Sequence, residues 1–337
     1  MITDARVLQP EFIPQEVEHR NPEVNHLSNA LKPIMDGHPG ETSLLLGPSG
    51  AGKTCIAQFT TERLRENVLD INTQYINCWQ DYTRFRVLHR ILDGIGQTVD
   101  IHRRSTPKDE LLERLQDYDG PHYVVILDEV DQLEDKSVLY DLYQTRGITM
   151  VLIANREEEL FATLDERLTS RLHSSVRIQF EKYPLDELVS ILEARAGWGL
   201  SEGAIGNDQI THIADAAAGD ARIGISILRN AARVADQQGT DTITEEIVRD
   251  AVPGGREEIR RKTAEKLRTH QRVLYEILQE EGEMSPGELY DEYCGRVDEA
   301  KTKRTVRNYL KKMEHYRLVT AQGEKRARTY RPREDPP

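Results

Sequence analysis

The eight residues GPSGAGKT, at positions 47 to 54, constrain the fold of this chain more than any other stretch. They match the pattern G-x-x-x-x-G-K-[ST] without deviation, follow the apolar run SLLL and open the amphipathic stretch TCIAQFTTERL. A phosphate-binding loop needs this strand, loop and helix order, because backbone N–H groups and the helix N-terminus must converge on the phosphates. The motif therefore predicts a nucleotide site in a parallel α/β domain. A simple Gly-rich turn would not require Lys-Thr at this offset.

Residue roles at the predicted site follow from the same motif. Lys53 would reach the β and γ phosphates, and Thr54 would hold Mg²⁺. Downstream, VVILDEVD places Asp128 and Glu129 at the end of an apolar strand, where ligands bind in open α/β sheets. Asp128 would join Thr54 around Mg²⁺, and Glu129 would orient and polarise the attacking water. The full set of expected nucleotide-binding residues in the loop is Gly47, Pro48, Ser49, Gly50, Ala51, Gly52, Lys53, Thr54 and Cys55.

Short apolar, β-branched runs alternate with amphipathic stretches up to about residue 180, at 43–47, 74–78, 123–129, 149–155 and 175–180. This alternation is typical of a parallel sheet covered by helices on both faces. From 185 to 252 the pattern is helical only, and Pro253, Gly254 and Gly255 form a breaker cluster that predicts a hinge. We therefore expect three domains: a nucleotide-binding base at 1–180, an all-α lid at 181–252 and a third domain at 253–337.

The third domain has the pattern of three helices followed by a hairpin. Ser285, Pro286 and Glu288 give a capping-box signature at the start of the second helix. In KTKRTVRNYLKKM, apolar residues recur at helical spacing and leave basic residues on the outer faces. RLVTA and RARTYR flank a turn that contains Gly323. This order predicts a winged helix-turn-helix.

Basic charge is concentrated in the same domain. Residues 296–333 hold 13 Lys and Arg against 4 Asp and Glu, although the whole chain has a formal net charge of -13. A charge run is often only a solvated face, and winged helices also bind proteins. Two adjacent basic elements favour DNA, and an acidic body would discourage indiscriminate binding to it. The residues expected to contact DNA lie on the third helix and on the wing: Arg304, Arg307, Asn308 and Lys311, then Arg326 and Arg328.

Other classes of protein find little support. No apolar run approaches the roughly 18 residues of a membrane span, and the start MITDARVLQPEF lacks the apolar segment of a signal peptide. We expect a cytoplasmic, nucleoid-associated protein. Cys55, Cys78 and Cys294 are far apart and form no CxxC pair, so neither a disulfide framework nor a zinc site is expected.

The motifs together resemble the AAA+ ATPases, which implies roles for four further residues. Asn155, at the end of MVLIAN, takes the place of sensor 1, where it could hydrogen-bond the water or the γ-phosphate. LDERLTSRLHS resembles the segment that supplies an arginine finger to a neighbouring subunit, with Arg171 or Arg167 as the finger. GDARIGISILRNAARVA resembles the sensor 2 helix, with Arg222 touching the γ-phosphate of its own subunit. Taken alone, each arginine could be a surface ion-pair partner.

Within the AAA+ proteins, residues 10 to 330 resemble the archaeal replication initiators of the Orc/Cdc type. The resemblance rests on FIPQEVEHRNPEVNHLSNAL, INCWQDYTRFRVLHRIL, LDERLTSRL and the sensor 2 segment in that order, followed by a winged helix. It implies that His19 and Arg20 lie near the adenine. It also implies a second DNA contact from an insertion after Cys78, a segment that contains Arg84, Arg86, Arg103 and Arg104.

The resemblance implies an ATP-dependent switch that binds double-stranded origin DNA and helps recruit or load the replicative helicase. ATP or ADP with Mg²⁺ would be the cofactor, hydrolysis would be slow and regulatory, and neighbouring AAA+ subunits would supply the finger. Three alternatives stay open at this point. The chain could be a branch-migration-type AAA+ DNA motor, a plasmid-borne or transcription-regulating relative, or a module whose winged helix docks on protein.

Overall fold

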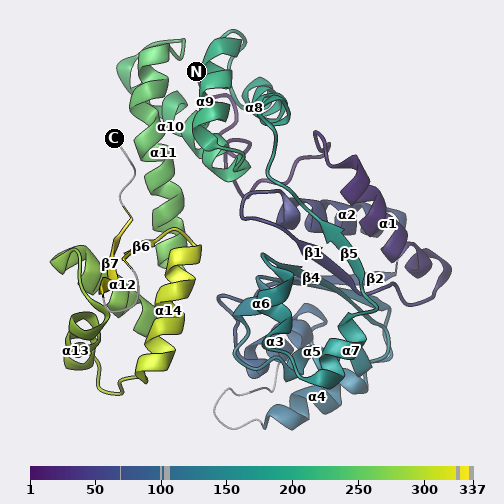
Figure 1. The fold of residues 1–337 in the computed structure, drawn as a ribbon. Coiled ribbons are helices and arrows are strands. Elements are labelled where there is room, and N and C mark those ends of the chain that lie inside the picture. The colour runs from purple at the N-terminus through teal and green to yellow at the C-terminus, as the bar shows by residue number, and fades with distance from the viewer. Residues whose placement is uncertain (69, 99–100, 102–106, 324–326, 334–337) are drawn as a thin grey trace.

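The computed structural model describes residues 1–68, 70–98, 101, 107–323 and 327–333 of the chain. Its centre is a parallel sheet of five strands in the order β2-β3-β4-β1-β5 (Figure 1). The strands lie where the sequence predicted them, to within about three residues at each end, and are β1 (Ser43–Leu46), β2 (Ile71–Asn77), β3 (His122–Asp128), β4 (Ile148–Ala154) and β5 (Val176–Gln179). This confirms the predicted α/β base.

Helices cover both faces of the sheet, because successive strand side chains point to opposite sides. Leu45 of β1 packs with α1 (Asn21–Leu31), the short 3₁₀ helix η1 (Lys32–Asp36) and α2 (Lys53–Asn67). Leu44 and Leu46 pack on the opposite face. The helices of that face are α3 (Arg84–Gly94), α4 (Lys108–Gln116), α5 (Ser137–Gln144), α6 (Glu157–Phe161) and α7 (Glu166–Leu172).

The lid consists of α8 (Leu185–Gly199), α9 (Asn207–Ala217), α10 (Ala221–Gln238) and α11 (Glu245–Glu265). The first dozen residues, which we expected in the base, lie against this lid instead. Leu8 is fully buried in the lid core, and Ile2 forms an isolated β-bridge with Leu200. Arg195 donates hydrogen bonds to the carbonyl oxygens of Val7 and Phe12. An apolar side chain and a buried guanidinium therefore hold the N-terminal segment on α8.

Helix α11 continues through Pro253, Gly254 and Gly255, so the prediction of a break at this cluster was wrong. The glycines serve helix packing. A Cβ atom at Gly255 would lie 2.7 Å from Cα of Ile227 on α10, and one at Gly254 would lie 2.4 Å from Nδ2 of Asn230. Close contact between α10 and α11 outweighs the low helix propensity of these residues. The domain boundary near residue 252 stays a prediction.

The C-terminal domain has the predicted order of three helices and a hairpin, with α12 (Thr269–Glu281), α13 (Pro286–Arg296), α14 (Lys303–His315) and the antiparallel strands β6 (Val319–Gln322) and β7 (Thr329–Pro332). The capping box of α13 is present: Glu288 donates its N–H to Ser285 Oγ, and Ser285 donates its N–H to the Glu288 carboxylate. Figure 1 shows α14 on the side of this domain that faces the base. One buried residue of its core, Trp79, comes from the base.

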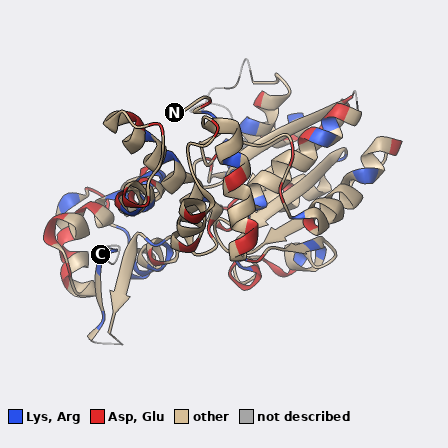
Figure 2. Cartoon of the chain, turned by 90° about the horizontal axis from the view of Figure 1, so that it is seen from above, with Lys and Arg blue, Asp and Glu red and all other residues tan. Residues whose placement is uncertain are grey.

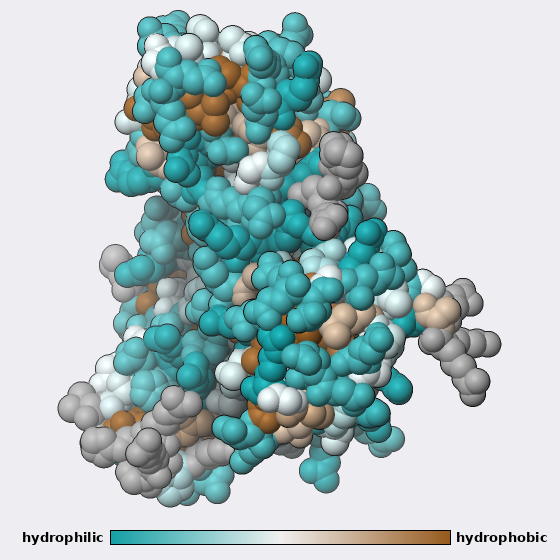
Figure 3. All heavy atoms as spheres, turned by 90° about the vertical axis from the view of Figure 1, so that its left-hand side faces the viewer, coloured by the Kyte–Doolittle hydropathy of each residue, from teal (hydrophilic) through white to brown (hydrophobic). Residues whose placement is uncertain are grey.

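The molecular surface is polar and carries both signs of charge. The side formed by the lid and the C-terminal domain is mostly hydrophilic, with small apolar patches (Figure 3). Lys and Arg alternate with Asp and Glu over all three parts of the chain (Figure 2).

Candidate nucleotide-binding site

The P-loop joins β1 to α2 and is shaped by glycines in backbone conformations that other residues rarely adopt. Gly47 has φ +144° and Gly50 has φ +79°. A Cβ atom at Gly47 would lie 2.2 Å from the carbonyl oxygen of Phe180, and one at Gly50 would lie 2.0 Å from the carboxylate of Asp220. The loop is thus pressed between β5 and the lid, and only glycine fits at these two positions.

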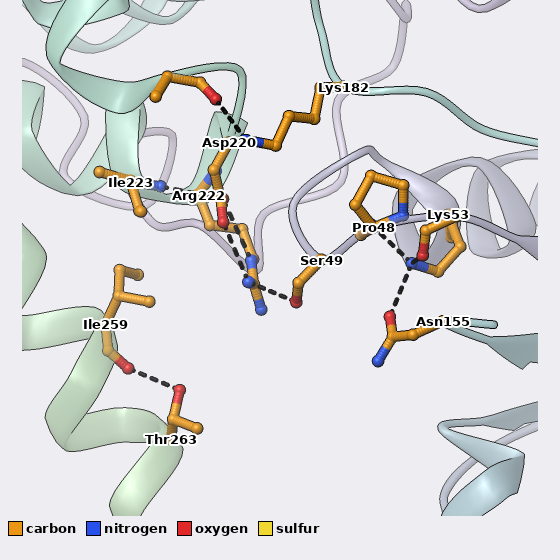
Figure 4. Close-up of polar contacts among 12 residues, drawn as sticks. Pro48, Ser49, Lys53, Asn155, Lys182, Asp220, Arg222, Ile223, Ile259 and Thr263 are labelled. Carbon is orange, nitrogen blue, oxygen red and sulfur yellow. Dashed lines mark hydrogen bonds and ion pairs between the residues drawn. The ribbon is translucent and has the colours of Figure 1, made fainter. Parts of the chain in front are cut away.

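Lys53 and Asn155 meet at the mouth of this loop. The Lys53 ammonium donates to the carbonyl oxygens of Gly47 (2.6 Å) and Pro48 (2.8 Å) and to Asn155 Oδ1 (3.2 Å) (Figure 4). Burial lowers the pKa of Lys53 to about 8. Its hydrogen-bond partners are neutral oxygens, so an incoming phosphate would be the anionic partner that a buried ammonium needs. The residues present therefore fit a nucleotide.

The acidic pair ends β3 directly beside the P-loop. Thr54 Oγ1 donates to Asp128 Oδ2 at 2.7 Å, and the Glu129 N–H donates to Asp128 Oδ1 at 2.8 Å. Among the described residues, no group of three or more His, Cys, Asp or Glu could hold a metal. Mg²⁺ commonly binds through one or two protein oxygens and completes its shell with phosphate and water. Thr54 and Asp128 fit such a site.

Glu129 has the features of a reactive carboxylate. Its backbone is left-handed, with φ +54°, and its buried Oε2 atom has no hydrogen-bond partner among the residues that the structure describes. Burial, followed by the repulsion of Asp128 and Asp131, raises its pKa to about 7. A buried acceptor without a partner is uncommon in a purely structural residue, and a shifted pKa is typical of functional sites. This geometry suits a group that accepts a hydrogen bond from water.

The lid closes over the P-loop at the start of α10. Asp220 caps this helix by accepting the N–H groups of Arg222 and Ile223. The Arg222 guanidinium then reaches Ser49 Oγ at 2.7 Å (Figure 4), and the Ala221 N–H donates to the Gly50 carbonyl at 3.2 Å. The structure thus brings Arg222 to the phosphate-binding loop, where the resemblance placed it.

A pocket at the junction of base and lid contains the P-loop, the acidic pair, Asn155 and Arg222. Part of its wall is apolar and was missed by the sequence reasoning, which gave these residues no role because they come from separate segments: Phe12, Pro14, Val17, Tyr183, Ile191 and Trp198. His19 and Arg20 do not line the pocket, although their neighbour Glu18 does, and their place near the adenine stays a prediction. The Arg20 guanidinium lies over the Tyr183 ring at 4.2 Å and pairs with Glu23, so it contacts a residue of the pocket wall without lining the pocket itself.

The two candidate finger residues lie on α7, outside this pocket. The Arg171 guanidinium stacks over the rings of Tyr140 (4.7 Å) and Tyr143 (5.8 Å) and donates to the carbonyl of Arg167, which is itself exposed. Their position agrees with action on a neighbouring subunit. That role stays a prediction.

The predicted DNA-contacting residues are only partly gathered by the fold. Four of them are exposed on α14: Arg304, Arg307, Asn308 and Lys311. Arg328 is partly buried on the wing and pairs with Glu314 at 3.2 Å, whereas Arg326 lies outside the described residues. In the insertion after Cys78, Arg84 pairs with Asp141 at 2.7 Å. Arg86 lies 3.7 Å from Asp81, and Arg103 and Arg104 are outside the described residues.

Comparison with known proteins assigns the family. Residues 39–161 match the family described as "AAA domain", and residues 189–252 match the "Cdc6 AAA+ ATPase-type lid domain". Over 330 residues the chain is 52% identical to ORC1-type DNA replication protein 9 of Halobacterium salinarum, an alignment that covers 98% of this chain and 93% of that protein. The chain belongs to the ORC1-type DNA replication proteins. The resemblance to initiators of the Orc/Cdc type is thereby confirmed.

A second relative supports the same family, and a solved structure shows the same fold. ORC1-type DNA replication protein 1 of the same organism is 56% identical over 308 residues, which cover 91% of this chain and all of that protein. The solved structure of the Aeropyrum pernix ORC1 protein in complex with DNA has a TM-score of 0.80 and 24% sequence identity, and covers 99% of this chain and 94% of that chain. This likeness shows a shared fold along almost the whole chain.

As an ORC1-type protein, the chain carries an AAA+ ATPase domain, which agrees with the geometry of the P-loop and the acidic pair. None of the helices that the structure describes is long and apolar enough to cross a membrane.

Proposed function

We propose that this ORC1-type protein is an ATP-dependent switch that binds duplex DNA at a replication origin and helps recruit or load the replicative helicase. ATP or ADP in the pocket would set how the winged-helix domain sits on the base. The relatives are named as DNA replication proteins, and the Aeropyrum pernix relative was solved in complex with DNA. Both facts support DNA as the partner.

The observation that carries this proposal is a direct connection between the acidic pair and the winged helix. The short 3₁₀ helix η2 (Val130–Gln132) follows Glu129. Gln132 Nε2 donates to the Tyr316 hydroxyl at 3.0 Å, and Arg268 donates to the Gln132 carbonyl at 2.6 Å. One residue, three positions after Glu129, thus contacts the end of α14 and the entry to α12. A displacement of η2 would therefore change these contacts with the winged-helix domain.

Aromatic contacts strengthen the same junction. The rings of Trp79 and Tyr316 have centroids 4.2 Å apart, and the Arg268 guanidinium lies 3.7 Å from the Tyr82 ring. A packed interface has discrete arrangements and does not deform continuously, so a small change beside Glu129 could select between two positions of the domain. The nucleotide could bias this choice only by as much as it binds one arrangement more tightly than the other.

The pocket supports slow turnover in an isolated chain. Arg222 hydrogen-bonds to Ser49 of the P-loop. Arg195, which also lies in the pocket wall, donates to backbone carbonyl oxygens of the N-terminal segment. A second arginine for the developing charge would come from Arg171 or Arg167 of a neighbouring subunit, and such arginines contribute greatly to phosphoryl transfer. Bound Mg²⁺, held by Thr54 and Asp128, would neutralise charge on the β and γ phosphates. Glu129 would accept a hydrogen bond from the attacking water.

Helix α14 has the properties of a recognition helix. Its inner face buries Val306, Leu310 and Met313, and its outer face exposes Arg304 and Arg307. Guanidinium groups can bind phosphate or make bidentate contacts with guanine in the major groove. A duplex on this helix would place the protein at the nucleoid.

Fluorescence anisotropy with origin-proximal and random duplexes, with and without ATP, tests the proposal. We expect tighter binding to the origin duplex and an effect of ATP on that preference. Lys53→Ala should abolish nucleotide binding, whereas Glu129→Gln should keep binding and stop turnover. Equal binding to both duplexes at every salt concentration would contradict the proposal. A stable hexamer with vigorous DNA-stimulated turnover would point to a motor instead.

A further inference from the structure

Tyr75 links the edge of the sheet to the acidic pair. It lies on β2, the edge strand next to β3, where Tyr75 pairs with Ile126 and Asn77 pairs with Asp128. Residues two apart on a strand share a face, so Tyr75 and Asp128 point to the same side of the sheet. The tyrosine side chain is long enough to reach the end of β3, and its hydroxyl donates to Asp128 Oδ2 at 2.9 Å.

The Asp128 carboxylate receives three hydrogen bonds from the described part of the chain. Oδ2 accepts from Tyr75 (2.9 Å) and from Thr54 Oγ1 (2.7 Å), and Oδ1 accepts from the Glu129 N–H (2.8 Å). Thr54 is itself a proposed Mg²⁺ ligand, and a hydroxyl that gives a lone pair to a metal still has its proton to donate to Oδ2. Tyr75 and the Glu129 N–H are the two donors that are not proposed metal ligands, and each holds one carboxylate oxygen. Together they would fix the plane of the carboxylate.

Packing alone does not account for this tyrosine. The Tyr75 side chain is 37% exposed, it lies in a surface groove with Ile13 and Trp198, and it belongs to none of the apolar cores among the described residues. Tyr123 on the adjacent strand offers a contrast. Its ring is fully buried, and its hydroxyl donates to the carbonyl of Ile91 at 2.8 Å. In Tyr123 the ring fills the core, whereas in Tyr75 the hydroxyl is the part that makes the specific contact.

We infer that Tyr75 is a positioning residue for the metal of the nucleotide site, which it orients through the carboxylate of Asp128. The inference rests on the proposed Mg²⁺ site and extends it by a residue that no motif includes. Partners that hydrogen-bond a metal-ligating carboxylate typically change metal affinity by about 10- to 100-fold when they are removed. Tyr75→Phe keeps the ring and removes only the hydroxyl.

The test is a titration of the full chain with Mg²⁺ in the presence of a fluorescent ATP analogue. For Tyr75→Phe, we expect the Mg²⁺ concentration at half-saturation to rise by about 10-fold, while analogue affinity in EDTA stays at the wild-type value. Tyr123→Phe is the matched control, because it also removes one tyrosine hydroxyl on a neighbouring strand but does not touch Asp128. It should lower thermal stability and leave the Mg²⁺ dependence unchanged.

A second measurement distinguishes action through Asp128 from a general effect on the fold. In an Asp128→Asn background, Tyr75→Phe should produce no further shift in Mg²⁺ dependence. A shift of equal size in both backgrounds, or equal shifts for Tyr75→Phe and Tyr123→Phe, would overturn the inference and leave the proposed Mg²⁺ site standing. Wild-type analogue binding that does not respond to Mg²⁺ would overturn the metal site and the role of Tyr75 together.

Discussion

Replacing Trp79 by alanine should release the winged-helix domain from the base. Trp79 follows β2 in the base, yet its side chain is 1% exposed and packs in the core of the C-terminal domain. Its ring packs at a tilt against the ring of Tyr316, and the Lys312 ammonium lies 5.3 Å from it. Because the side chain crosses between domains, its removal should weaken docking more than it weakens either domain.

The size of the effect follows from the buried volume that is lost. Truncation of a buried tryptophan to alanine typically costs about 3–5 kcal/mol. If this cost falls on the docked state, the ratio of docked to released molecules drops roughly 100- to several-thousand-fold, since each 1.4 kcal/mol is a factor of ten. The Arg268 contacts with Gln132 and Tyr82 remain and oppose release.

Small-angle X-ray scattering measures this change as an increase in the radius of gyration. Tyr316→Phe is the control, because it keeps the ring and removes only the hydrogen bond from Gln132, which is worth about 0.5–1.5 kcal/mol. That variant should stay compact. A wild-type radius of gyration for Trp79→Ala, or a loss of stability confined to the base, would refute the argument that this tryptophan joins the two domains.

Three further changes have defined outcomes. Gly255→Ala should lower the free energy of unfolding by about 1–3 kcal/mol through overpacking against α10. The control is Gly295→Ala, which places a methyl group in open space on a helix and should cause no such loss. Thermal melts compare the two variants. Burial, together with repulsion from Arg268 and Lys136, lowers the pKa of Lys312 to about 7, against the attraction of Asp131 and Glu129. Between pH 7 and about 10 the unfolded chain therefore binds more protons than the folded chain does. The free energy of unfolding should rise with pH across that window, and denaturant titrations should show a shallower rise for Lys312→Met. Arg307→Ala should weaken duplex binding and reduce the salt slope of log affinity by about 1, as measured by anisotropy, while Arg65→Ala on α2 should not.

Local patterns predicted most of the secondary structure because their causes are local. Apolar β-branched runs gave the strands of the sheet, and Ser285 with Glu288 gave the start of α13. The same local reasoning failed at Pro253 to Gly255, where helix propensity argues for a break. There the close packing of α10 on α11 requires glycine and keeps the helix continuous.

The candidate site was predicted where a single stretch of sequence carries it and missed where separate segments meet. GPSGAGKT and the acidic pair are contiguous motifs, so Lys53, Asp128 and Glu129 could be identified at once. Tyr75 could not, because its contact with Asp128 depends on the register between β2 and β3. The apolar pocket wall depends on how the N-terminal segment crosses the lid.

The sequence by itself determined a P-loop ATPase with a helical lid and a basic winged helix, because each of these elements is specified by spacing within one segment of the chain. Only the tertiary structure decided that the lid core includes the N-terminal segment, that α11 runs unbroken and that α14 rests on the residues that follow the acidic pair. These features arise from contacts such as Gln132 with Tyr316, which lie 184 positions apart. Contacts of that kind leave no periodic signal in the sequence, since each is a single pair fixed by the packing of whole domains.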